Sequence, residues 1–279
     1  YAQLYGTGSA LSKMLLGARN QCCGGGAILI NASRGVQLDG VLKADAQMPC
    51  VTCPTARRRA LRTVELDTHC CDERSVAEGE ECDGLGGASG GSVVVLAGSS
   101  LPLNGTGSVY ARGGDGTYYV DSLTNASSPT AGGSGGRIAL PECSALGDAS
   151  VQVRGGLNSE RDCGQGRRCQ CGAAGTLFYA QCNAGGTRVL VDNGGYYTRA
   201  STYLVAEGAP TREEAPAITE LHVLSGAQLQ AEANRNVSAI DRILLRESAR
   251  VRLGPTQALV TGALSITSAE VSGPFESAS

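Results

Sequence analysis

The chain has 279 residues, of which 23 are basic and 26 acidic, giving a net charge of −3. This balance argues against nucleic acid or an anionic membrane as a partner, and no stretch approaches the roughly 18 consecutive apolar residues that span a bilayer. With 40 glycines, two Phe and no Trp, the core must be filled by Val, Leu, Ile and Ala, which suits thin, regularly layered β-structure.

Residues 1–21 form a lead-in that precedes the first repeat. The chain starts at Tyr1 rather than Met, so we expect a processed chain or a piece of a larger one. A glycine-led repeat then occupies the region 22–206. Its four units lie at 24–45, 90–114, 135–156 and 172–195.

Each repeat unit has the same order of features. A glycine cluster leads into a short apolar strand, a turn follows, and a second strand alternates apolar and polar residues. The clearest second strands are 108–112, 150–154 and 188–192. The glycines are expected to allow positive φ and close backbone approach where the chain turns.

One such unit cannot bury its apolar face alone, so the units are expected to stack with parallel strands in successive coils. Right-handed crossovers are strongly favoured in such connections. The sequence therefore predicts an all-β, right-handed parallel β-helix, or β-solenoid.

Three further segments complete the predicted organisation. The repeat is interrupted at 49–83 by a stretch with five cysteines and the run 57–59 of three arginines, which we interpret as a disulfide-stapled loop excursion. Residues 207–217 form a loop or linker containing Pro210 and Pro216. Residues 218–279 contain glycine-poor strands that fit further coils and a fragment end.

Three phrases identify a family resemblance: 87–96 (GASGGSVVVL), 110–116 (YARGGDG) and 132–140 (GGSGGRIAL). They resemble the glycine-rich β-helix repeats of very large secreted and surface proteins of bacteria, oomycetes and green algae. The match covers roughly residues 22 to 195. The family has no shared active site, so the resemblance implies an architecture alone. The Ala-, Gly- and Arg-rich composition also resembles algal surface glycoproteins such as the subunits of mastigoneme filaments.

The twelve cysteines allow two interpretations. Zinc is suggested by the C-x₂-C spacing of Cys50 and Cys53, and a disulfide framework by the even number and the adjacent pairs. We favour disulfides because the chain has only two histidines and its other close pairs fit no common zinc motif. The candidates are Cys22, Cys23, Cys50, Cys53, Cys70, Cys71, Cys82, Cys143, Cys163, Cys169, Cys171 and Cys182.

Four N-x-[ST] sequons are candidates for N-linked glycans: Asn31, Asn104, Asn125 and Asn236. Sequons and cysteines together predict an extracellular or cell-surface protein.

No catalytic residue is assigned. A carbohydrate-active β-helix would need paired carboxylates, or a carboxylate-bound calcium with an arginine base, on neighbouring coils. The residues in repeat phase are Asp115, Asp121, Asp148, Asp162, Arg112, Arg137 and Arg154, which equally describe outward-facing polar positions. The Tyr118–Tyr119 and Tyr196–Tyr197 pairs and Tyr203 are candidate contact residues or strand-edge packing. The fragment 113–116 (GGDG), His69 and His222 are single features, and we predict no cofactor and no metal.

Three functions follow, in order of preference. The first is a non-catalytic structural subunit or stalk of an extracellular glycoprotein assembly, such as a filament, surface layer or wall layer, with other protein subunits as partners. The second is a glycan- or protein-binding adhesion module. The third is a polysaccharide lyase or hydrolase.

Overall fold

The computed structural model describes only part of the chain. The described residues are 24–33, 35–46, 87–97, 103–116, 119–120, 127–128, 131–141, 146, 151–158, 160–161, 163, 171–182, 186–204, 218–231 and 237–273. All regular elements in these ranges are β-strands, so the described part is all-β, as predicted. Within the same ranges there is no helix long and apolar enough to cross a membrane.

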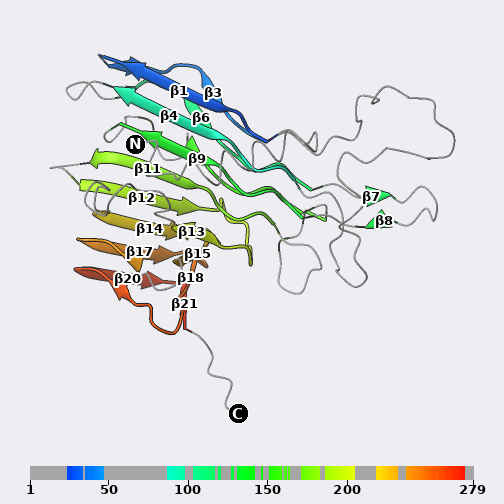
Figure 1. Ribbon diagram of the computed structural model, residues 1–279, viewed down its shortest axis with the longest axis vertical. Coiled ribbons are helices and arrows are strands. Elements are labelled where there is room, and N and C mark those ends of the chain that lie inside the picture. The colour runs from blue at the N-terminus through cyan, green and yellow to red at the C-terminus, as the bar shows by residue number, and fades with distance from the viewer. Residues whose placement is uncertain are drawn as a thin grey trace, which may run out of the picture.

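An eight-stranded sheet runs the length of the molecule (Figure 1). In spatial order its strands are β1 (Ala27–Ala32), β4 (Ser92–Ala97), β9 (Arg137–Leu140), β11 (Thr176–Cys182), β12 (Gly186–Asp192), β14 (Glu220–Leu224), β17 (Arg242–Arg246) and β20 (Ala263–Thr267). The strands follow sequence order, and apart from β11 and β12 long segments separate consecutive strands. Each pass of the chain therefore adds one strand beside the previous one.

Shorter strands form smaller sheets. One contains β10 (Val151–Gln152), β6 (Ser108–Tyr110) and β3 (Val41–Lys43), and another β13 (Thr202–Leu204), β15 (Gln228–Ala231), β18 (Arg250–Arg252) and β21 (Glu270–Ser272). The two-stranded pairs are β2 (Val36–Gln37) with β5 (Leu103–Asn104), β16 (Val237–Ser238) with β19 (Leu259–Val260), and β7 (Tyr119–Val120) with β8 (Ser127–Ser128). All pairs are parallel except β7–β8 and β11–β12.

The large sheet consists of two parallel blocks that meet in an antiparallel pair. We call β1, β4, β9 and β11 the N-terminal block, and β12, β14, β17 and β20 the C-terminal block. Between them, Leu177 lies opposite Leu190 and Phe178 opposite Val189. We predicted that 186–195 would repeat the second strands at 108–112 and 150–154. That prediction is wrong for β12. This strand joins the large sheet and runs antiparallel to β11, so the strands after it run opposite to those of the N-terminal block.

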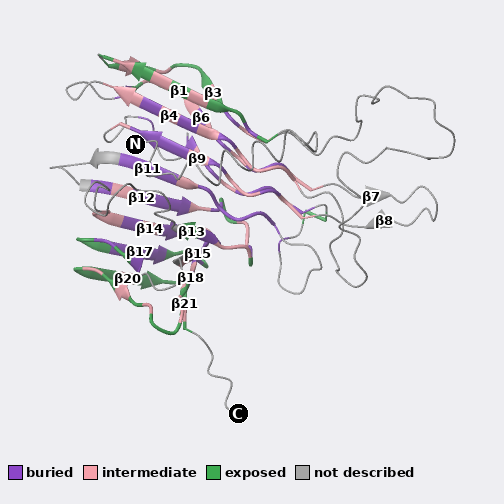
Figure 2. Cartoon of the chain, viewed as in Figure 1, coloured by how far each residue is buried: buried purple, intermediate pink, exposed green. Residues whose placement is uncertain are grey.

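The two blocks bury opposite faces of this sheet. In the N-terminal block the buried cluster includes Val93, Ile138 and Leu177, and it extends across the junction to Leu190. In the C-terminal block it includes Leu221 and Ile243 and extends back to Phe178, which alternates with Leu177 along β11. Because successive strand residues point to opposite faces, the core changes sides at the β11–β12 pair. Figure 2 shows burial concentrated in the middle strands of the sheet.

The glycine clusters form a packed bundle of extended segments at one end of the N-terminal block (Figure 1). Within one segment, the backbone amides that donate to the same neighbouring segment are three residues apart. Gly113 N donates to Arg154 O and Gly116 N to Leu157 O. In the same way, Gly172 N donates to Gly156 O and Gly175 N to Val153 O. A period of three is typical of polyproline II geometry, in which bonds run to several neighbouring chains. The bundle comprises 24–26, 44–46, 87–91, 111–116, 131–136, 153–158 and 171–175.

Close approach, rather than positive φ, explains these glycines. A Cβ on Gly136 would lie 2.0 Å from the carbonyl oxygen of Gly91, and one on Gly133 would lie 2.0 Å from that of Ala88. Among the described glycines, positive φ occurs at Gly105, Gly194, Gly195 and Gly226, outside the bundle. The expected positive φ is confirmed at the turns that contain Gly105, Gly194 and Gly195. The glycines of the bundle instead confirm the expected close backbone approach.

The chain leaves and re-enters the bundle at the same end. Segment 44–46 leads out and 87–91 leads back, as do 111–116 with 131–136 and 153–158 with 171–175. The predicted excursion 49–83 thus falls between the first such pair, although it lies outside the described residues, as do the lead-in 1–21 and the segment 207–217.

Candidate functional site

The segment 193–202, which begins directly after β12, binds the last two segments of the glycine bundle, 153–158 and 171–175, through buried polar side chains. Asn193, which is fully buried, accepts a hydrogen bond from Gly155 N at 2.9 Å through Oδ1 and donates through Nδ2 to Tyr196 O at 2.7 Å. The buried Thr198 and Thr202 hydroxyls donate to Cys171 O and Ala174 O, each at 2.6 Å. These bonds occupy backbone groups that another glycine segment would otherwise take.

A cavity of about 360 Å³ lies beside this segment, where the three-stranded sheet ends at β10 while the large sheet continues. Its apolar part comes from core residues of both sheets, and its polar part from the ends of β10 and β12. The lining residues are Val151, Gln152, Val153, Arg154, Leu177, Leu190, Asp192, Gly194 and Tyr196. The cavity therefore marks the junction of the two blocks.

The guanidinium of Arg154 is the cation of this cavity. Its carbon lies 4.9 Å from the ring centroid of Tyr196, a cation–π contact. Its Nη1 is shielded from solvent and has no hydrogen-bond partner in the described part of the protein. Asp192 also lines the cavity, where its Oδ1 accepts a hydrogen bond from Gly194 N at 2.7 Å.

Arg154 is the last member of a ladder that also contains Asp45 and Arg112. Backbone hydrogen bonds from Ala46 N to Arg112 O and from Gly113 N to Arg154 O continue the registers of β3–β6 and β6–β10. Arg112 binds Asp45 through Nε and Nη2 at 2.9 and 2.6 Å and stacks on Tyr110 at 4.6 Å. The hydrogen bond to Asp45 raises the pKa of Arg112. Arg112 and Arg154, which share a repeat phase in the sequence, are thus aligned in the structure, and of these two only Arg112 is paired with a carboxylate of the described residues.

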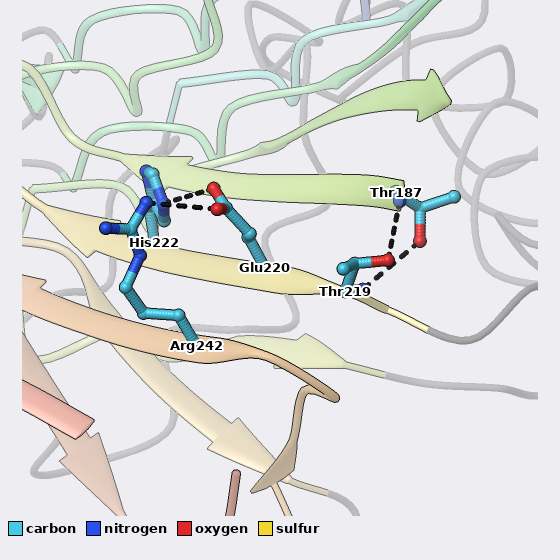
Figure 3. Close-up of polar contacts among 5 residues, drawn as sticks. All are labelled: Thr187, Thr219, Glu220, His222 and Arg242. Carbon is cyan, nitrogen blue, oxygen red and sulfur yellow. Dashed lines mark hydrogen bonds and ion pairs between the residues drawn. The ribbon is translucent and has the colours of Figure 1, made fainter. Parts of the chain in front are cut away.

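A second polar cluster occupies β14 and β17 (Figure 3). Glu220 accepts from Arg242 Nη2 at 3.0 Å and lies 3.1 Å from His222 Nε2. Burial lowers the pKa of His222, Arg188 and Arg242 lower it further, and Glu220 opposes them. Beside the cluster, Thr187 N donates to Thr219 Oγ1 at 2.8 Å, and Thr219 N to Thr187 O at the same distance.

The cavity and this cluster share one face of the large sheet. His222 is in register with Leu190, a cavity-lining residue, and Glu220 is in register with Arg188. Arg188 in turn stacks on Tyr179 at 4.6 Å. The charged residues of β12, β14 and β17 therefore lie on the same face of the sheet as the cavity, next to its apolar wall.

The other predicted catalytic candidates do not converge in the described residues. Asp115 Oδ1 accepts a bond from Leu157 N at 2.9 Å, which connects two glycine segments. Arg137 lies in β9, in register with Ser92 and Thr176. Asp121, Asp148, Asp162 and His69 lie outside the described residues. The fragment 113–116 belongs to the glycine bundle, and the described residues contain no group of three or more His, Cys, Asp or Glu that would hold a metal ion.

The predicted tyrosine pairs have different positions. Tyr196 and Tyr197 stack on Arg154, which follows β10, and on Arg250 of β18, and Tyr197 Oη also accepts a hydrogen bond from Arg250. Tyr203 is 54% exposed. Tyr118 and the side chain of Tyr119 are not among the residues and side chains that the structure describes.

One disulfide joins Cys163 and Cys171, both buried. Cys182 ends β11, and its side chain is not described. The remaining candidates, Cys22, Cys23, Cys50, Cys53, Cys70, Cys71, Cys82, Cys143 and Cys169, lie outside the described residues, as do Asn125 and Asn236. Asn31 in β1 and Asn104 in β5 are exposed.

Sequence reasoning missed Asp45, Asn193 and Glu220. Asp45 could have been found by aligning the ends of the first three units, because it occupies the position of Arg112 and Arg154. Asn193 and Glu220 carried no such signal, since their partners come from other segments of the chain.

Comparison with known proteins adds no assignment: no family model, no curated protein and no solved structure matches this chain.

Proposed function

We propose that this protein is a non-catalytic structural subunit of an extracellular glycoprotein assembly, built as a right-handed parallel β-helix of two blocks. The parallel registers of the strands and the general preference for right-handed crossovers support this architecture. One observation carries the functional proposal: apolar positions that are fully buried in inner strands are half-exposed in β20 and β21, the last strands of the described residues.

Three in-register pairs illustrate this observation. Ile243, Leu245 and Val251 are 0% exposed, whereas the residues beside them on the next strands, Leu264, Ile266 and Val271, are 48%, 47% and 37% exposed. Figure 2 shows the exposed β20 beside the buried β17. Burying apolar surface is favourable by about 25 cal/mol per Å², so this end of the stack favours the addition of another strand layer. Among the described residues β20 has no further strand beside it, and a sheet edge of this kind favours the same outcome.

The occupant we propose is a second copy of the chain, related by a two-fold axis through the β20 edge. Such an axis pairs β20 with its own copy in antiparallel orientation and keeps both cores on one side of the sheet. Leu264 and Ile266 would then meet the same residues of the partner. The β11–β12 pair shows that antiparallel pairing is compatible with this sheet.

Head-to-tail stacking of β20 on β1 is less favourable. Because the two blocks bury opposite faces, Leu264 and Ile266 would share a face with Leu29 and Asn31, while Ile28 would meet polar residues such as Ser265. Asn31 is exposed on β1, and a glycan there would obstruct that edge.

The test is the oligomeric state of the secreted protein, measured by sedimentation velocity over a range of concentrations. We expect self-association that is lost in the double variant Leu264→Glu/Ile266→Glu, because each carboxylate would enter an apolar contact. The control is Val41→Glu, which changes an apolar residue that is 61% exposed on β3, far from β20 in the stack. It should associate like the wild type.

Circular dichroism must show that the variants retain strand content. A wild-type protein that stays monomeric at high concentration overturns the proposed assembly. Association abolished by Val41→Glu but unaffected by the β20 variant would overturn the proposed interface.

A further inference from the structure

We propose that the cavity between β10 and β12 binds a small carboxylate-bearing ligand through Arg154. This inference concerns a different part of the molecule from the proposed subunit contact, and neither depends on the other.

The first argument is the internal comparison between two arginines in one ladder. Arg112 has two partners, the ring of Tyr110 and the carboxylate of Asp45. Arg154 occupies the next position and has the equivalent aromatic partner, Tyr196, but no carboxylate from the described residues. A carboxylate bound in the cavity would take for Arg154 the place that Asp45 has beside Arg112, so that each arginine would have one aromatic and one carboxylate partner.

The second argument is the cost of the unpartnered nitrogen. Buried polar groups are nearly always hydrogen-bonded, and hydrogen bonds between a guanidinium and a carboxylate are among the strongest in proteins. Arg154 Nη1 is shielded from solvent without an acceptor, and the side chain borders an open volume of about 360 Å³, so a ligand in this volume would reach Nη1 once the guanidinium turns toward it. This volume falls within the range of small-molecule sites.

The remaining lining residues restrict the ligand. Asp192 would repel a simple anion, so the ligand must present a hydroxyl or ammonium donor on that side. Gln152 offers an amide that both donates and accepts, and Leu177 and Leu190 supply an apolar wall. A hydroxycarboxylate of about six carbons fits this combination of charge, donors and size.

The position in the fold explains why the cavity exists. The three-stranded sheet stops at β10, but the large sheet continues through β11 and β12. The place of the next short strand is taken by 193–196, which turns through Gly194 and Gly195 with φ of 62° and 86°. A side chain at Gly194 would lie 3.2 Å from Arg154 Cδ, so the absence of a Cβ there leaves room for the arginine.

The experiment measures binding of D-glucuronate and D-glucose, which differ in the carboxylate, to the whole protein by isothermal titration calorimetry. We expect glucuronate to bind and glucose not to bind. Arg154→Met should weaken glucuronate binding at least about tenfold, because it removes the charge and keeps a similar length. Arg154→Lys should bind with intermediate affinity, since it keeps the charge without the planar fork.

The matched control is Arg252→Met, which removes an exposed arginine from β18 and should bind as the wild type does. Thermal unfolding provides the second readout: glucuronate should raise the Tm of the wild type and of Arg252→Met but not that of Arg154→Met. This comparison remains informative if Arg154→Met is less stable, because each protein is compared with itself.

Three results would overturn the proposal. They are the absence of glucuronate binding to the wild type, equal binding by Arg154→Met, and equally tight binding of inorganic sulfate, which has no donor for Asp192.

Discussion

Phe178 of β11 and Val189 of β12 lie opposite each other across the antiparallel junction, on the face that the C-terminal block buries. Their neighbours Leu177 and Leu190 also lie opposite each other, but on the face that the N-terminal block buries. This pair of strands is therefore buried on both faces and joins the two cores into one molecule.

Replacing Phe178 with Ala should destabilise the protein strongly. Phe178 is 3% exposed, and truncation of a buried Phe costs about 3–5 kcal/mol through lost transfer energy and the cavity that remains. Urea unfolding monitored by circular dichroism measures this change. Leu29→Ala is the control: Leu29 is 68% exposed, so its truncation should change the free energy of unfolding by about 0.5 kcal/mol or less. Equal effects of the two variants would contradict the shared-core junction.

Gly136→Ala tests the close approach within the glycine bundle. The new Cβ would lie 2.0 Å from Gly91 O, so adjacent segments must separate and backbone hydrogen bonds lengthen. We expect a loss of more than about 2 kcal/mol, measured by chemical denaturation. Gly40→Ala has no atom within 4 Å of its Cβ and no positive φ, so it should be neutral or slightly stabilising. A tolerated Gly136→Ala would show that the bundle is looser than described.

Asn193→Ala tests the side-chain hydrogen bonds that connect the segment after β12 to the end of the glycine bundle. The substitution leaves Gly155 N and Tyr196 O without their side-chain partner in a buried environment, which costs about 1–3 kcal/mol each. Hydrogen exchange should show faster exchange of the Gly155 amide. The exposed Thr256→Ala serves as the control and should leave both stability and exchange unchanged.

His222 should make the protein less stable in mild acid. Its folded-state pKa is lowered chiefly by burial, so the unfolded chain takes up a proton first as the pH falls below about 6.5. Stability is therefore lost between about pH 6.5 and the lower folded-state pKa, with a slope of at most about 1.4 kcal/mol per pH unit.

The variant His222→Gln should remove this contribution. The difference in unfolding free energy between about pH 7.5 and about pH 5.5 should be smaller in His222→Gln than in the wild type. Glu220, Arg188 and Arg242 remain in both proteins. An unchanged difference would mean that His222 does not titrate as its environment implies.

Several features were predictable because they depend on local pattern. The alternation in 108–112 predicted a strand, and the structure has β6 there with Val109 0% exposed. Arg112 and Arg154 share a repeat phase in the sequence and are aligned in the structure. The glycine clusters indicated close backbone approach. Their extended, three-residue packing was not predicted, because glycine is equally compatible with turns.

The all-β character, the buried apolar positions and the glycine-dependent packing follow from the sequence alone, because they rest on residue type and spacing. The reversal at β11–β12 follows only from the tertiary structure. The segment 186–192 carries the same alternation as 108–112, and alternation specifies neither strand direction nor which sheet a strand joins. That reversal moves the core to the other face of the sheet. It also ends the short sheet at β10, and leaves Arg154 beside a cavity where Arg112 has Asp45.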